Sequence, residues 1–176
     1  MHLEGSIFFR KKPNDFVILV VCTANITRSP YIAALLRKTL VESGLRFRRR
    51  IVVKSAGTNA TANQQALPTI ATIAYTRGID LQEHRSSLLT GELINEASLI
   101  LTAEMQHKES ILKRFPEAYD RVYQITEYGR LGNDPKIRDV IDPTGRDLEE
   151  FQEFVGIAHE EVKRVLEHMV RIGAIE

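Results

Sequence analysis

The 176-residue sequence predicts a single α/β domain in which a parallel sheet of about four strands carries helices on both faces. Two observations predict this class. Short apolar runs typical of buried strands alternate along the chain with longer segments in which apolar residues recur every three or four positions. No repeat, low-complexity tract or Gly/Ser-rich linker divides the sequence. We therefore expect one domain over residues 16–176, preceded by an N-terminal extension over residues 1–15.

Four segments have the composition of strands. Residues 16–22 (F-V-I-L-V-V-C) form an apolar run without alternation, which favours a strand buried on both faces. Similar runs predict strands at 51–55, 98–103 and 121–126. The strand at 51–55 leads into an A-G-T turn at 56–58.

The intervening segments have helical spacing. Pro30 opens a first helix that Gly44 ends, a second covers about 66–77, and a polar helix extends to about Arg114. We expect the histidines on helices, His107 among them, to be exposed. In the final helix, apolar residues recur at steps of three or four with Glu and Lys between them: Leu148, Phe151, Val155, Ala158, Val162, Val165 and Met169.

Composition excludes several classes of function. The sequence is 43% hydrophobic and 27% charged with a net charge of +1, which favours neither disorder nor binding to nucleic acid or membrane. The longest apolar stretch is too short to span a bilayer, and the N-terminus lacks the charge order of a signal peptide. With Cys22 as its single cysteine, the chain has no internal disulfide and no cysteine-rich zinc site. We expect a cytoplasmic protein without metal or cofactor, of undetermined oligomeric state.

Cys22 lies where the first strand ends and the first helix begins. In parallel sheets, binding sites form beyond the carboxyl ends of the strands. Backbone N–H groups of such a loop, together with the helix dipole, bind a tetrahedral dianion, and Arg28 adds a planar fork for two of its oxygens. The same positive potential favours the thiolate of Cys22, to which Ser29 is able to donate. The pattern predicts a nucleophile aimed at phosphorus. The alternative is a structural cysteine, with Arg28 as a solvated helix cap.

The segment V-C-T-A-N-I-T-R-S-P at 21–30 resembles the signature V-C-x-G-N-x-C-R-S-P of the low-molecular-weight protein-tyrosine phosphatases. S-A-G-T at 55–58, D-P at 142–143 and the final helix follow in that family's order. The resemblance implies the family's fold, a phosphocysteine intermediate on Cys22, and a supporting hydrogen-bond network of Asn25, Ser55 and His84. It also implies a phosphate-binding loop made of Thr23, Ala24, Asn25, Ile26, Thr27, Arg28 and Ser29.

Ester cleavage also needs a proton donor for the leaving oxygen. Asp142 is preferred because apolar residues precede it, a Pro-fixed turn follows it, and it has the family's position before the last helix. Asp134 and Asp139 are the alternatives, although Asp134 lies in a charged, Gly-flanked stretch that is typical of an exposed loop.

The sequence departs from the family pattern at three places. Ala24 replaces a glycine, Thr27 replaces a second cysteine, and Thr144 with Gly145 replaces tyrosines that often follow Asp-Pro. Ile26 is the apolar type that the resemblance associates with aromatic substrates, whereas relatives acting on phosphoarginine tend to have threonine there. We expect a metal-independent phosphatase of phosphoproteins, foremost of phosphotyrosine. The alternatives are phosphoarginine or a small phosphate ester as substrate, or a non-catalytic phosphate-binding module.

Overall fold

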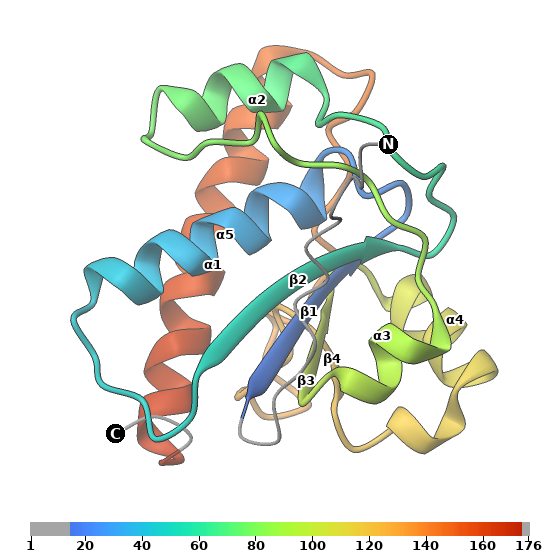
Figure 1. Ribbon diagram of the computed structural model, residues 1–176, viewed down its shortest axis with the longest axis vertical. Coiled ribbons are helices and arrows are strands. Elements are labelled where there is room, and N and C mark those ends of the chain that lie inside the picture. Colours follow the sequence, from blue (N-terminus) through green and yellow to red (C-terminus); the bar gives the residue numbers. More distant parts are fainter. Residues whose placement is uncertain (1–14, 174–176) are drawn as a thin grey trace, which may run out of the picture.

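The computed structural model describes residues 15–173 (Figure 1). The N-terminal extension, apart from Asp15, lies outside the described residues. No helix formed by residues 15–173 is long and apolar enough to cross a membrane. The elements in chain order are β1 (Phe16–Cys22), α1 (Arg28–Glu42), β2 (Ile51–Gly57), α2 (Pro68–Tyr75), α3 (Gly91–Glu96), β3 (Leu99–Thr102), α4 (Met105–Arg114), the 3-10 helix η1 (Pro116–Ala118), β4 (Val122–Gln124) and α5 (Leu148–Arg171).

The four strands form one parallel sheet in the order β2-β1-β3-β4. In the register of the two central strands, Val21 of β1 pairs with Ala56 of β2 and with Thr102 of β3. The carboxyl ends of these strands therefore meet at one edge of the sheet, and the loop that follows Cys22 begins there. The predicted fold class, a parallel four-stranded sheet within one α/β domain, is confirmed.

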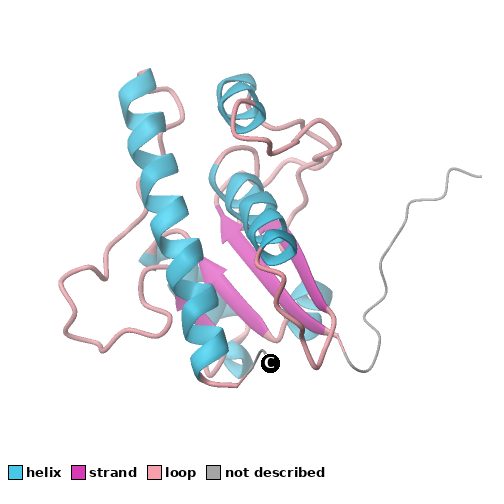
Figure 2. Ribbon diagram, turned by 90° about the vertical axis from the view of Figure 1, so that its left-hand side faces the viewer, coloured by secondary structure: helices cyan, strands magenta, loops and turns pink. Residues whose placement is uncertain are grey.

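Side chains of β1 alternate between two apolar cores, one on each face of the sheet. Ile18 and Val20 pack into the larger core, which α1, α2 and α5 complete. Leu19 and Val21 pack into the smaller core, together with residues of α3 and α4. Figure 2 shows the long helix α5 and its neighbour α1 lying over one face. Both faces of β1 are thus buried, which explains its unbroken run of apolar residues.

Several element bounds differ from the sequence predictions. Helix α3 was not predicted, because six residues are too few to establish a helical period; Thr90 caps it by accepting from the Leu93 amide at 3.3 Å. Helix α1 begins at Arg28, two residues before Pro30. Strand β2 extends two residues beyond the prediction, to Gly57, because it pairs with β1 up to the start of the functional loop.

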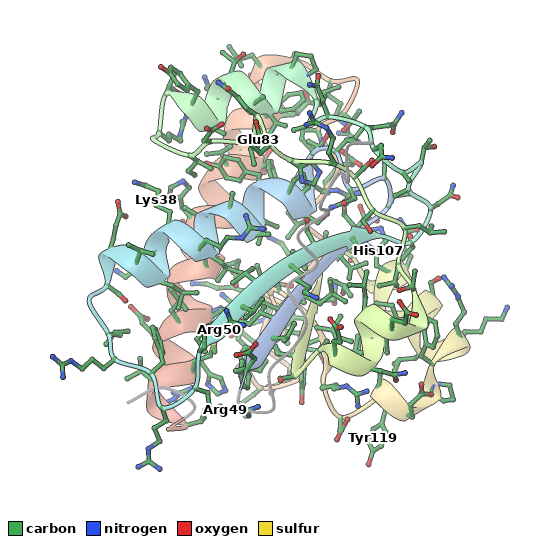
Figure 3. All side chains as sticks on the ribbon, in the orientation of Figure 1. Lys38, Arg49, Arg50, Glu83, His107 and Tyr119 are labelled. Atoms are coloured by element: carbon green, nitrogen blue, oxygen red, sulfur yellow. The ribbon has the colours of Figure 1, made fainter. Side chains whose placement is uncertain are left out.

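The two ends of the sheet carry different chemistry. Figure 3 shows His107 near the carboxyl ends of the strands and Arg49 and Arg50 at the opposite end. Arg50 forms an ion pair with the buried Asp15 at the start of β1, with Nε 2.9 Å from Oδ1. That pair anchors one end of the basic run, 46–50, to the fold, away from the edge where Cys22 lies.

Candidate active site

The loop between β1 and α1 is fixed by hydrogen bonds to its carbonyl oxygens. The amides of Thr58 and Asn59, which follow β2, donate to the carbonyls of Cys22 and Thr23, both at 2.9 Å. The Leu67 amide donates to the Ile26 carbonyl at 2.8 Å. Three carbonyls are therefore held by backbone groups outside the loop.

The amide groups of the same loop are left without backbone acceptors. Among residues 15–173, no backbone carbonyl accepts from the amides of Thr23, Ala24, Ile26 or Thr27. The first turn of α1 adds the amides that every helix leaves unpaired at its N-terminus, along with the positive end of its dipole. A loop with bonded carbonyls and available amides at a helix start is suited to bind an oxyanion.

Asn25 sets the shape of the loop. Its φ of 56° lies in the left-handed region, which asparagine tolerates better than most residues. The side-chain amide donates to Ser29 Oγ at 2.8 Å and to Ser55 Oγ at 3.0 Å, and Oδ1 accepts from the Ser87 amide at 2.9 Å. Ala24 is not among the described residues with positive φ, so its methyl group imposes no such strain on the loop.

His84 completes this network from the other side. Its Nε2 lies 2.7 Å from the Asn25 carbonyl, which only accepts, so Nε2 carries the hydrogen. Burial lowers the pKa of His84 more than this hydrogen bond raises it, and the neutral ring is favoured at pH 7. The structure thus brings together Asn25, Ser55 and His84, the three residues predicted to support the loop.

The Cys22 sulfur lies at the base of this loop. The residue is 3% exposed, and its Sγ lies 3.0 Å from Ser29 Oγ and 3.3 Å from the Asn25 amide nitrogen, which donates to it. Because Asn25 Nδ2 donates to Ser29 Oγ, the serine hydrogen is available for the sulfur or for the Ala56 carbonyl, 3.3 Å away. Among residues 15–173, the Asn25 amide and the Ser29 hydroxyl are therefore the two donors within hydrogen-bond distance of the sulfur.

Arg28 is fully buried beneath the loop. Its Nη1 donates to the Val140 carbonyl at 2.9 Å and to Glu104 Oε1, and its Nη2 donates to Asp142 Oδ2 at 2.8 Å. Arg28 Nε, which is also buried, has no acceptor within residues 15–173. An oxyanion bound to Nε and Nη2 would use both donors on one edge of the guanidinium.

Of the three aspartates considered as proton donor, Asp142 is the one in contact with Arg28. Its side chain is 38% exposed, and its Oδ1 accepts from the Thr144 amide at 3.0 Å. The carboxylate of Asp139 instead binds the Met105 amide at the start of α4, at 2.7 Å. Asp134 forms an ion pair with Arg130, with Oδ2 3.4 Å from Nε. Geometry therefore separates Asp142 from both alternatives.

His107 is buried, so the prediction that it is exposed was wrong. Its Nδ1 accepts from the Glu104 amide at 3.1 Å, and its Nε2 lies 2.8 Å from Thr23 Oγ1. Burial of the ring, together with the nearby Arg28 guanidinium, lowers the pKa of His107 despite the carboxylates around it. In the neutral ring, Nε2 therefore donates to Thr23. The polar residues around His107 in the sequence suggested an exposed helix face. The contact with Thr23 arises only because α4 packs against the loop.

Two further residues at this edge of the sheet were not singled out from the sequence. Glu104, two residues beyond the end of β3, accepts from Arg28, and its side chain is 12% exposed. Its place just beyond a strand's carboxyl end is the signal that points to it. Gly57 ends β2 against the loop, where an added Cβ would lie 3.0 Å from the Ala24 carbonyl carbon, beside the Thr23 carbonyl oxygen. A side chain at position 57 would displace the phosphate-binding loop.

The fold and this site define a class of protein, the cysteine-dependent phosphatases of α/β fold. The Cys22 sulfur accepts from a loop amide, and the Arg28 guanidinium contacts both Thr23 of the same loop and the Asp142 carboxylate. A family model described as low molecular weight phosphotyrosine protein phosphatase matches residues 17–172. The chain therefore belongs to the low-molecular-weight protein-tyrosine phosphatase family, and it is a phosphatase that acts through a phosphocysteine.

Individual relatives divide between two named activities. The chain is 35% identical over 136 residues to a probable low molecular weight protein-tyrosine-phosphatase, EpsP, of Ralstonia nicotianae, covering 77% of this chain and 83% of the relative. It is equally 35% identical over 138 residues to a protein-arginine-phosphatase of Bacillus subtilis, covering 77% and 85% of the two chains.

Solved structures show the same division. The YwlE arginine phosphatase from Geobacillus stearothermophilus superposes with a TM-score of 0.76 at 31% identity, covering 89% of this chain and 94% of that one. The tyrosine phosphatase Wzb from Escherichia coli in complex with sulphate superposes with a TM-score of 0.74 at 27% identity, covering 87% and 97%.

Proposed function

We propose that this phosphatase acts on phosphotyrosine in proteins, with Cys22 as nucleophile, Arg28 as phosphoryl-binding group and Asp142 as proton donor. The carrying observation is that Asp142 contacts Arg28, in the loop that begins at Cys22, although 114 positions separate the two residues. We also propose that the protein works in the cytoplasm, where a reducing environment keeps a catalytic thiol free.

In the first step the Cys22 thiolate attacks phosphorus, and the bond between phosphorus and the tyrosine oxygen breaks. The departing oxygen takes the proton of Asp142, so that a neutral phenol leaves. The loop amides, together with Nε and Nη2 of Arg28, stabilise the charge that builds on the equatorial oxygens, where preorganised donors contribute most.

In the second step Asp142, now a carboxylate, takes a proton from water, which attacks the phosphorus of phosphocysteine. The sulfur–phosphorus bond breaks, inorganic phosphate leaves, and the thiolate is restored. Two groups donate to Cys22 Sγ: the Ser29 hydroxyl and the Asn25 amide. They make the thiolate a better leaving group because they stabilise its charge.

The preference for tyrosine is supported by Ile26. Ile26 is half-buried, between the buried loop residues Asn25 and Thr27. An aromatic ring attached to a phosphate in the loop would gain apolar contact with Ile26, whereas the guanidinium of phosphoarginine would gain none.

Phosphoarginine is the second candidate substrate. The observation in its favour is that relatives named for either activity share the same 35% identity with this chain. The Cys22 and Arg28 chemistry serves both substrates, because the phosphoryl group is the same and only the leaving atom differs.

The first test is hydrolysis of p-nitrophenyl phosphate in EDTA, with and without vanadate, by the wild type and Cys22→Ser. We expect activity that survives EDTA, is blocked by vanadate and is lost in the variant. Full activity of Cys22→Ser would contradict the assigned nucleophile. Vanadate binding without wild-type turnover would instead indicate a phosphate-binding module.

The second test compares kcat/KM for matched peptides that carry phosphotyrosine or phosphoarginine at one position, in the wild type and in Ile26→Thr. We expect the wild type to favour phosphotyrosine and the variant to lose about fivefold on that peptide, since roughly 1 kcal/mol of apolar contact is removed. A wild-type preference for phosphoarginine would overturn the substrate assignment while leaving the cysteine mechanism intact.

A further inference from the structure

The Thr27 side chain does not cap helix α1, although Thr27 is the N-cap residue. At this position a threonine hydroxyl ordinarily accepts from an amide in the first turn. No such bond forms, and the third residue of the helix is Pro30, which has no amide hydrogen to donate. The hydroxyl, on a residue that is 2% exposed, is therefore directed elsewhere.

The partner of Thr27 is Thr144, which follows Asp142 by two residues. The two hydroxyl oxygens lie 2.9 Å apart, although the residues are separated by 117 positions in sequence. This bond links the phosphate-binding loop directly to the segment that carries the proposed proton donor. Its two members occupy positions at which the family's pattern has a cysteine and often a tyrosine.

Thr144 also holds Asp142 itself. The Thr144 amide donates to Asp142 Oδ1 at 3.0 Å, while Arg28 Nη2 donates to Oδ2 at 2.8 Å. A phosphoryl group bound to Arg28 competes with Asp142 for Nη2. The contact between Arg28 and Asp142 therefore weakens at the step in which Asp142 transfers its proton. The contact through Thr144 does not involve Arg28, so a phosphoryl group bound to Arg28 does not compete for it.

We propose that the hydrogen bond between Thr27 and Thr144 positions the carboxyl group of Asp142 over the leaving oxygen, making both threonines positioning residues for proton transfer. The inference rests on the proposed function, since it acts through Asp142. Without this bond the segment is free to move away from the loop, and protonation of the leaving group falls while attack by Cys22 continues.

The test measures kcat/KM on two esters, because this constant reports cleavage of the phosphorus–oxygen bond. Phenyl phosphate has a poor leaving group that needs the proton, and p-nitrophenyl phosphate has a good one that needs it far less. In Thr144→Val, which keeps the amide but lacks the hydroxyl, we expect about a fivefold loss on phenyl phosphate, the worth of one hydrogen bond. The loss on p-nitrophenyl phosphate is expected to be clearly smaller.

Three companion variants make the result specific. Thr144→Ser restores the hydroxyl and is expected to recover most of the lost activity. Thr27→Val combined with Thr144→Val is expected to lose no more than the larger single loss, because both changes remove one bond. Thr76→Val serves as matched control, because it removes a threonine bond of 2.8 Å to the Ile73 carbonyl at the end of α2, away from the loop.

The outcomes separate this inference from the function on which it rests. An inactive wild type, or turnover that persists in Cys22→Ser, contradicts the proposed function and the positioning role together. A wild type that hydrolyses both esters through Cys22, with variants that lose nothing or lose equally on both esters, contradicts the positioning role alone. Additive losses in the double variant would also overturn it.

Discussion

The two loops that meet at the active site are held in opposite ways. Four residues of the phosphate-binding loop are at most 2% exposed, and its backbone is bonded to segments after β2 and before α2. The segment that carries Asp142 is more exposed: Ile141 is 60% exposed and the Asp142 side chain 38%, although Val140 and Pro143 are buried. Every residue from 144 to 149, directly after this segment, is exposed.

This difference separates two tasks of catalysis. The sulfur and the oxyanion donors must be preorganised, and burial in the fold provides this at no cost during the reaction. The proton donor must reach leaving groups of different shape, and a surface segment held by a few polar contacts leaves room for them. Substitutions in the loop are therefore expected to lower activity strongly on every substrate. Substitutions near Asp142 are expected to lower it more on substrates with poor leaving groups than on those with good ones.

The largest effect is expected from Arg28→Lys. A lysine retains the positive charge but loses the planar fork, including the buried Nε that has no acceptor in the described residues. We expect kcat to fall about 1000-fold on good and poor leaving groups alike, the upper range for one oxyanion donor. Arg114→Lys at the end of α4 is the control, and thermal melting checks folding. A loss below tenfold would show that this side chain does not bind the transition state.

Asp142→Asn sharpens the comparison by exposing the leaving-group dependence. The amide keeps the shape of the side chain and removes its proton transfer, so we expect about a 100-fold lower kcat/KM on phenyl phosphate. The loss on p-nitrophenyl phosphate is expected to be smaller. Asp134→Asn, in an aspartate paired with Arg130, is the matched control. If Asp134→Asn caused the larger loss, the proton donor would be misassigned.

The rigidity of the loop is tested through stability. Asn25→Ala removes the bonds to Ser29, Ser55 and the Ser87 amide while retaining a Cβ at a φ of 56°. We expect the free energy of unfolding in urea to fall by about 3 kcal/mol. Asn25→Gly loses the same bonds without the backbone strain and is expected to cost about 1 kcal/mol less. Equal losses would indicate that the left-handed conformation relaxes in the variant.

The smallest expected effect is on the pH dependence of stability. Because burial holds the pKa of His84 below its ordinary 6.5, the unfolded chain takes up a proton that the folded chain resists. This residue's contribution is complete above pH 6.5 and is lost as the pH falls below it. His84→Gln keeps a donor for the Asn25 carbonyl without titrating. We expect its unfolding free energy to decline less steeply between pH 6.5 and 5 than that of the wild type. Parallel curves would contradict the neutral histidine.

The sequence was sufficient for features that are local in the chain. Strand β1, which ends at Cys22, and the change from strand to helix after it were predicted because strand, loop and helix follow one another within a few residues, although α1 begins two residues earlier than expected. Helix α3 was not predicted because its six residues are too few to show a helical repeat of apolar residues. The burial of His107 and the bond between Thr27 and Thr144 depend on how α4 and the Asp142 segment pack against the loop, and no pattern of neighbouring residues encodes that packing.

The central claim is that Cys22 is the residue that accepts the phosphoryl group. The most direct measurement is to mix Asp142→Asn with p-nitrophenyl phosphate, quench in acid within the first turnover, and locate the phosphoryl group by peptide mass spectrometry. In this variant the second step lacks its base, so phosphocysteine is expected to accumulate on the peptide that contains Cys22. A phosphoryl group on another residue, or continued turnover with none on Cys22, would contradict the account.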